Sequence, residues 1–248
     1  MGAQLRNIST IFWDSFTESV KTKRALLLIV SYLLLMYLGI KAGSLLEVFS
    51  WALAGSRQSF SLLLPFYVSV IILPLFSIIV GYNMISDEIS SGSIKFMAYR
   101  TDRFSIIAGK LLSSGFLVTL IVLIAYMASL VFIHSRTGLW FFLPYAISWI
   151  YLSIYAFSFT CLAIAVSSIA RSPSSSILWS VLVCAVFLLI FNISYAKVIS
   201  PFYFSNNALD FLIDGVFIDM LLGAIVLCLH SLIYSMIGYI SIRKADLS

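Results

Sequence analysis

One segment of this chain, residues 84–110, gathers side chains that could do polar chemistry. Seven charged residues lie between positions 87 and 110, although only 10% of the whole chain is charged: Asp87, Glu88, Lys95, Arg100, Asp102, Arg103 and Lys110. Residues of these types can form ion pairs, helix caps and contacts with a polar surface. Because long apolar runs stand on both sides, we expect this polar segment to lie in water or against another protein.

Motifs that bind nucleotides or carry out catalysis are missing from the sequence. It contains no GxxxxGK[ST] phosphate loop, no HExxH, no CxxC and no GxSxG. We therefore predict that the chain is not an enzyme and has no catalytic, cofactor-binding or metal-binding residues of its own.

The cysteines and the histidine in the last apolar run do not form a ligand set. Cys161, Cys184 and Cys228 lie inside apolar runs without metal-ligand spacing, and we interpret them as small buried hydrophobic residues. His230 is ionisable within an apolar run, which makes it a candidate functional residue. We favour the alternative, a neutral imidazole that hydrogen-bonds across a helix pair. So few charges within the runs also argue against a proton-driven or sodium-driven carrier.

The composition as a whole predicts a membrane protein. The chain is 62% hydrophobic with a mean hydropathy of +1.08, whereas about half of a soluble domain is apolar and about a quarter is charged. The net charge of +5 comes from residues that are scattered and flank the apolar runs. This pattern indicates membrane topology and does not indicate a nucleic-acid partner.

The apolar runs predict an all-α integral membrane protein with six transmembrane helices in one domain, residues 1–248. Since about 20 residues cross the hydrocarbon core, we expect spans at about 25–44, 60–84, 104–133, 144–170, 174–196 and 220–242. Before them, residues 4–20 predict an amphipathic helix in the membrane interface, the alternative being a partly ordered tail. Its apolar residues recur at helical spacing: Leu5, Ile8, Ile11, Phe12, Phe16 and Val20.

Two polar segments connect spans. In the first, Ser90–Ser93 favours a turn, residues 94–100 favour a short amphipathic helix, and Asp102 is a candidate N-cap for the next span. The second, residues 197–219, mixes polar and aromatic residues. It is predicted to be an external segment that re-enters the outer leaflet.

Positive charges predict the orientation. With both termini in the cytoplasm, eleven basic residues face inward and four, Lys41, Arg57, Arg136 and Lys197, face outward, which obeys the positive-inside rule. The eleven inward residues are Arg6, Lys21, Lys23, Arg24, Lys95, Arg100, Arg103, Lys110, Arg171, Arg243 and Lys244. The polar segment 84–110 is then cytoplasmic.

The polar segment resembles the signature of ABC type-2 transporter permeases. The matching residues are Glu88, Gly92-Ser93-Ile94, Arg103 and Gly109-Lys110-Leu111-Leu112. The family's proline before the arginine is absent, and Tyr99-Arg100-Thr101-Asp102 stands there instead. The layout of the spans, the serine-rich turn near Ser167 and the external segment that begins near Pro201 are similar to the family as well.

This resemblance implies the transmembrane permease subunit of an ABC exporter in the cell membrane, with a cytoplasmic coupling helix between spans 2 and 3. Two copies of a separate ABC ATPase would bind ATP-Mg and dock on residues 84–103, and a second permease chain would complete a homodimer or heterodimer. Membrane lipid is the other expected partner. The residues implied for ATPase docking are Glu88, Gly92, Ile94, Met97, Tyr99 and Arg103.

Two other classes of function compete with a transporter. A membrane scaffold or complex-assembly protein that moves nothing would also have six spans and a polar docking segment. A membrane enzyme ranks last, because the spans contain no convergent polar residues.

Overall fold

Helices account for all the regular structure in the described part of the chain. The structure is a computed structural model that describes residues 2–54, 60–138, 140, 142–205 and 217–245. Within these residues, six helical segments are long and apolar enough to cross a membrane: Lys23–Leu46, Leu63–Ser91, Arg103–Ser135, Phe142–Ile169, Pro173–Phe191 and Phe217–Arg243. The prediction of an all-α membrane protein with six spans is confirmed.

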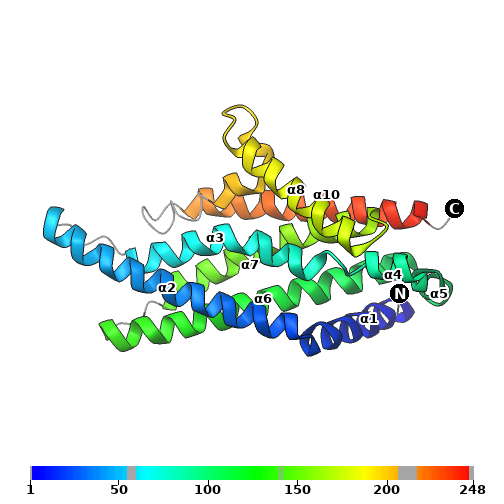
Figure 1. The fold of residues 1–248 in the computed structure, drawn as a ribbon, viewed down its shortest axis with the longest axis horizontal. Helices are drawn as coiled ribbons and strands as arrows, with labels where there is room; N and C mark the ends of the chain where they lie inside the picture. Colours follow the sequence, from blue (N-terminus) through cyan, green and yellow to red (C-terminus); the bar gives the residue numbers. More distant parts are fainter. Residues whose placement is uncertain (1, 55–59, 139, 141, 206–216, 246–248) are drawn as a thin grey trace.

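Helix α7 (Phe142–Ile169) is the centre of the bundle. It packs against α3 (Phe60–Gly81), α6 (Arg103–Thr137) and α10 (Phe217–Ala245). Tyr155, Phe159 and Ile164 of α7 are among the largest fully buried side chains of the chain. α7 therefore supplies the interior against which α3, α6 and α10 pack (Figure 1).

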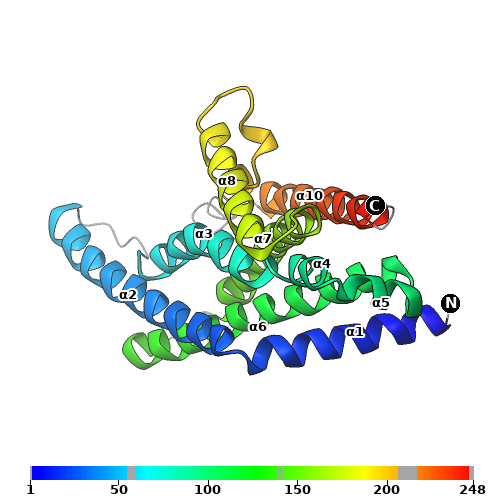
Figure 2. The same ribbon diagram turned by 45° about the vertical axis from the view of Figure 1, so that its right-hand side comes forward.

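Helices α2 and α8 lie at the outside of the bundle. α2 (Lys23–Ala54) packs against α3 and α6. α8 (Pro173–Phe191) contacts α7 and α3 but stands at an angle to the other spans, as Figure 2 shows. Leucines such as Leu178 and Leu189 on α8 are exposed. Because lipid chains are as apolar as leucine, such a surface costs little free energy in a membrane.

The largest differences between the predicted span ends and the structure are at the ends of α2 and α8. α2 continues to Ala54, beyond the predicted span end at residue 44, and residues 55–59 lie outside the described part. α8 ends at Phe191 instead of residue 196. There the side-chain amide of Asn192 donates a hydrogen bond to the Leu188 carbonyl (2.8 Å), which competes with the next backbone hydrogen bond of the helix.

The predicted N-terminal helix is present as α1 (Gly2–Lys21) and lies along α6. Phe12 and Phe16 pack against Phe116 of α6, with ring centroids 5.8 and 5.4 Å apart. The ring of Trp13 lies edge-on to those of Phe12 and Phe16 and is 55% exposed. The location of α1 in the membrane interface stays a prediction.

Part of the predicted external segment lies against the bundle. After the short 3-10 helix η1 (Lys197–Ile199), residues 201–205 are helical, and the ring of Phe202 lies 5.0 Å from that of Phe159. The Tyr151 hydroxyl donates a hydrogen bond to the Phe204 carbonyl. Residues 206–216 are outside the described part, and entry into the outer leaflet stays a prediction.

Two of the three cysteines are buried, and the His230 ring contacts two backbone carbonyls. Cys161 and Cys184 are buried as predicted, whereas the prediction is wrong for Cys228, which is exposed on α10. The two ring nitrogens of His230 lie 2.9 Å from the Val226 carbonyl and 3.2 Å from the Ile199 carbonyl. The imidazole therefore joins α10 to the segment after α8, in agreement with the interpretation as a cross-helix hydrogen bond.

Candidate functional site

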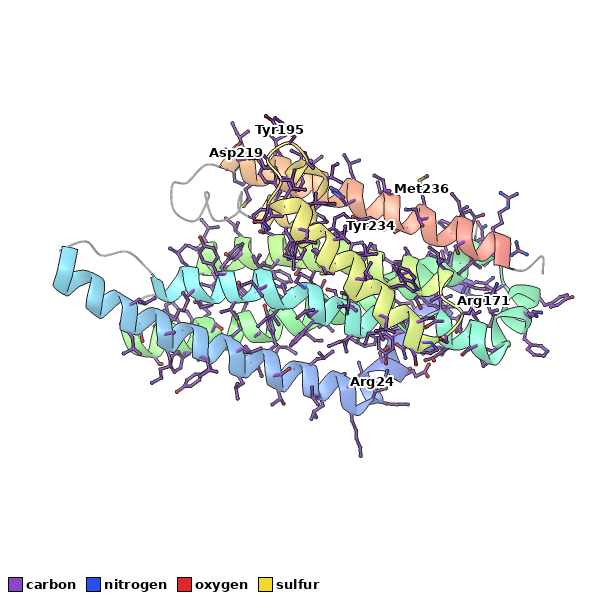
Figure 3. All side chains as sticks on the ribbon, turned by 45° about the horizontal axis from the view of Figure 1, so that its top comes forward. Arg24, Arg171, Tyr195, Asp219, Tyr234 and Met236 are labelled. Atoms are coloured by element: carbon purple, nitrogen blue, oxygen red, sulfur yellow. The ribbon has the colours of Figure 1, made fainter. Side chains whose placement is uncertain are left out.

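The polar segment lies at the end of the bundle that also holds both chain termini (Figures 1 and 2). It forms α4 (Ser86–Ser91), a turn at Gly92, α5 (Ser93–Arg100) and the first residues of α6. Figure 3 shows Arg171 at this end of α8, while Tyr195 and Asp219 lie at the opposite end. The turn predicted at Ser90–Ser93 is thus found, but it is limited to Gly92, because Ser90 and Ser91 belong to α4 and Ser93 begins α5.

Gly92 makes the turn between α4 and α5 possible. Its φ of 74° lies in the left-handed region, which favours glycine, and its N–H donates to the Ile89 carbonyl (3.2 Å). An added Cβ would meet open space, so this position requires glycine for its backbone angle and not for lack of room.

The start of α4 is held by a serine of the central helix. The backbone N–H groups of Ile85 and Ser86 both donate to the hydroxyl oxygen of Ser167 on α7, at 3.1 and 2.9 Å. The first N–H groups of a helix lack partners within the helix, and here a distant side chain supplies one. Ile85, Ser86 and Ser167 are all fully buried. α4 is therefore fixed to the centre of the bundle.

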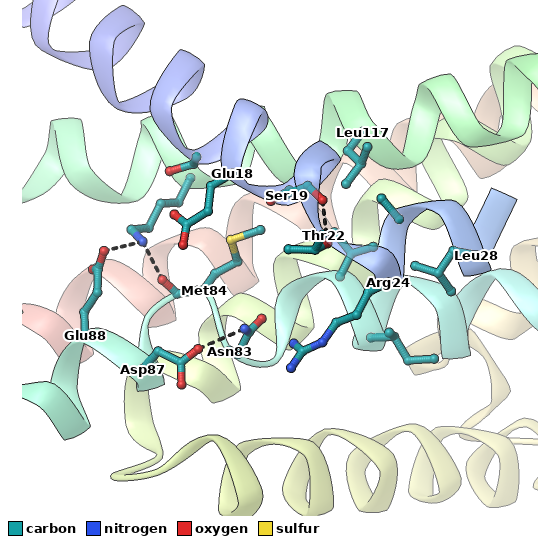
Figure 4. Close-up of a pocket in the computed structure, with 15 residues that line it drawn as sticks. Glu18, Ser19, Thr22, Arg24, Leu28, Asn83, Met84, Asp87, Glu88 and Leu117 are labelled. Atoms are coloured by element: carbon teal, nitrogen blue, oxygen red, sulfur yellow. Dashed lines mark hydrogen bonds and ion pairs between the residues drawn. The ribbon is translucent and has the colours of Figure 1, made fainter.

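A buried ion pair within the polar segment joins α4 to α6. Lys110 Nζ lies 2.6 Å from a carboxylate oxygen of Glu88, and the two side chains are only 7% and 19% exposed (Figure 4). Lys110 also donates to the Met84 carbonyl at 2.5 Å. Because a charge is costly to bury without its partner, this pair ties α4 and the last residues before it to the second turn of α6.

The start of α6 is capped as predicted. The Asp102 carboxylate accepts hydrogen bonds from the Ser105 N–H (3.2 Å) and the Ser105 hydroxyl (2.7 Å). Next to it, the Arg103 guanidinium donates to the Arg243 carbonyl near the end of α10 (3.3 Å). Arg103 thus connects the start of α6 to the last span.

The apolar residues of α5 point in two directions. Ile94 is only 8% exposed and belongs to the core of the chain, and Met97 is half-buried. Tyr99 and Phe96 are 91% and 76% exposed. Of the apolar residues implied for docking, Tyr99 is therefore the one that faces fully outward. Phe96 joins it on the outer surface, at i and i+3 spacing that the sequence already contains.

The six residues implied for docking do not form one cluster. Glu88 and Ile94 face the bundle, Gly92 forms the turn, and Arg103 contacts the end of α10. Lys110 and Ser167, which hold the segment in place, were not among the implied docking residues. Lys110 could be suspected from its place in the signature, whereas no sequence pattern pairs Ser167 with α4.

Glycine at position 109 allows α1 to lie close to α6 beside Lys110. A Cβ there would come 2.7 Å from Ile11 Cγ2 and 3.2 Å from the Ile8 carbonyl oxygen. The Gly-Lys step of the signature therefore serves two contacts: Gly109 admits α1, and Lys110 binds Glu88.

A known protein family matches most of the chain. Residues 9–235 match the family described as ABC-2 family transporter protein. The chain belongs to this family. It is accordingly an ABC transporter permease and a multi-pass membrane protein, and the polar segment lies wholly inside the matched region. Among curated proteins, none matches the chain.

Proposed function

We propose that this ABC-2 permease is the membrane subunit of an exporter driven by a separate ABC ATPase that docks on residues 84–103. The observation that carries the proposal is α5, a short helix between two spans whose Phe96 and Tyr99 side chains face away from the bundle. Exposure of large aromatic side chains to water is unfavourable in free energy, and such side chains are typical anchors of a protein interface.

The proposal assigns binding and hydrolysis of ATP-Mg to the partner. Two ATPase copies and a second permease chain, identical or related, would complete the transporter, with both termini of this chain in the cytoplasm of the cell. This permease would then hold no cofactor and perform no catalysis. Its task is to convert a movement of the ATPase into a movement of its spans.

The contacts of the polar segment support such a transmission. A force applied to α5 passes through the Gly92 turn to α4. From α4 it reaches α6 through the Glu88–Lys110 ion pair and α7 through the hydrogen bonds to Ser167. Ile94 holds α5 against the bundle. Because these groups are buried and packed, we expect them to move as a unit, which is what differential contact with two ATPase states requires.

The test is co-purification of the full-length permease in mild detergent from its native host, with and without Tyr99→Asp. An ABC ATPase should accompany the unchanged permease, and Tyr99→Asp should weaken its binding at least about tenfold, since aromatic anchors contribute about 2 kcal/mol or more. Tyr195→Asp is the matched control, because Tyr195 is 100% exposed at the opposite end of the bundle.

Absence of any ATPase, or an equal effect of both tyrosine variants, would contradict the docking proposal. In the first case a membrane scaffold becomes the better assignment. Phe96→Asp gives a second variant in α5, with the same expected loss.

A further inference from the structure

A cavity of about 140 Å³ lies where α1 meets the start of α2, the end of α3 and α4 (Figure 4). Its polar lining includes Glu18, Ser19, Thr22, Arg24, Asn83 and Asp87. Its apolar lining comes from the spans themselves, with Leu28 of α2 and Ile79 of α3. The cavity therefore has one polar side and one apolar side.

The charges that line the cavity are separated in space. Figure 4 shows Glu18, Asp87 and Glu88 toward one side and Arg24 on the other. Lys110 is already engaged by Glu88, and in the described part of the chain neither Arg24, Glu18 nor Asp87 takes part in an ion pair. A ligand that complements this lining carries a cation and an anion a short distance apart.

The acidic side also offers an acceptor without a donor. The second carboxylate oxygen of Glu88 is buried and accepts no hydrogen bond from the described residues. Asp87 receives one hydrogen bond, from the Asn83 amide (2.9 Å). Since a buried acceptor without a donor costs free energy, this side favours a cation that bears N–H groups over one that bears only methyl groups.

The cavity lies where two candidate spans begin or end, which is the depth at which we expect lipid headgroups. One candidate span begins at Lys23, just before Arg24, and another ends at Ser91, just after Asp87 and Glu88. The charged end of the cavity is therefore at the boundary of the hydrocarbon core. Beside it, Leu26 and Leu27 of α2 are 68% and 65% exposed and offer an apolar surface for acyl chains.

We propose that this cavity binds the headgroup of phosphatidylethanolamine. The primary ammonium lies on the acidic side near Glu18 and Asp87, and the phosphate lies against Arg24, whose guanidinium carbon is 5.7 Å from the Tyr82 ring centroid. Phosphatidylcholine has no N–H to donate, and an anionic glycerol headgroup brings no cation to the carboxylates. The site therefore selects the zwitterion with a primary amine.

The experiment is native mass spectrometry of the purified, delipidated full-length chain with single lipids: dioleoyl phosphatidylethanolamine, phosphatidylcholine or phosphatidylglycerol. We expect about tenfold tighter binding of phosphatidylethanolamine than of the other two, because hydrogen bonds between charged groups are among the stronger ones. Free phosphoethanolamine separates a lipid from a soluble ligand, and we expect it to compete poorly. No ATPase is needed, so the result is independent of the docking proposal.

Matched variants locate the bound headgroup. Arg24→Gln and Asp87→Asn should each weaken phosphatidylethanolamine binding about fivefold, the range expected for partly exposed ion pairs. Lys23→Gln and Asp14→Asn remove the same charges at exposed residues outside the cavity lining and should leave binding unchanged. Equal affinity for the three lipids, equal effects of Arg24→Gln and Lys23→Gln, or full competition by free phosphoethanolamine would each overturn the proposal.

Discussion

At the scale of single residues, the ion pair between Lys110 and Glu88 is unusual because two charged side chains are largely buried beside an apolar bundle. Lys110 also satisfies the Met84 carbonyl, so one ammonium group holds two positions of the polar segment. Removal of one partner leaves the other charge buried without compensation, whereas removal of both partners leaves none.

We predict that Lys110→Met lowers the free energy of unfolding by about 3 kcal/mol, the usual cost of an orphaned buried charge. Glu88→Gln in the Lys110→Met background should recover most of the loss, because no charge then remains buried. Thermal unfolding of the detergent-purified chain measures both variants. Lys95→Met, in the same segment but exposed, should change stability by no more than about 0.5 kcal/mol. Additive losses in the double variant would show that the two residues act separately.

At the scale of elements, the contact between α1 and α6 depends on the missing side chain at Gly109. We predict that Gly109→Ala strains or separates the two helices at a cost of about 1–3 kcal/mol, since the new Cβ would lie 2.8 Å from Ile11 Cβ. Trypsin should then cleave faster after Lys21 and Lys23, at the junction of α1 and α2, because local opening exposes this backbone.

Gly238→Ala is the control for this prediction. It adds the same methyl group to a buried glycine of α10, where the closest neighbour, the Ala165 Cα, is 3.5 Å away and in ordinary contact. If Gly109→Ala and Gly238→Ala are cleaved at the same rate as the unchanged chain, α1 does not need close contact with α6.

At the scale of the whole molecule, both termini and the polar segment share one end of the bundle (Figures 1 and 2). We predict that this end is cytoplasmic, because most basic residues are at this end. In a variant with Cys161, Cys184 and Cys228 changed to alanine, Ser194→Cys at the opposite end should react with a membrane-impermeant maleimide in intact cells. Ser91→Cys should react only after lysis, although Ser91 and Ser194 are both exposed. The reverse pattern would invert the topology.

Much of the architecture was determined by the sequence alone. The six spans follow from the lengths of the apolar runs, α1 from helical periodicity, and the Asp102 cap from its place just before an apolar run. All three depend on residues close together in the chain and on a lipid solvent that demands satisfied backbone groups. The signature of residues 88–112 was enough to indicate the family that the comparison then showed.

The arrangement around the polar segment was decided only by the tertiary structure. Pairing of Glu88 with Lys110, capping of α4 by Ser167 and the shape of the cavity near Arg24 all join residues distant in the chain. In α5, apolar residues occur on more than one face, so periodicity could not tell that Ile94 packs inward while Phe96 points outward. Which face is buried depends on the helices that α5 meets, and a pattern within eight residues does not contain that information.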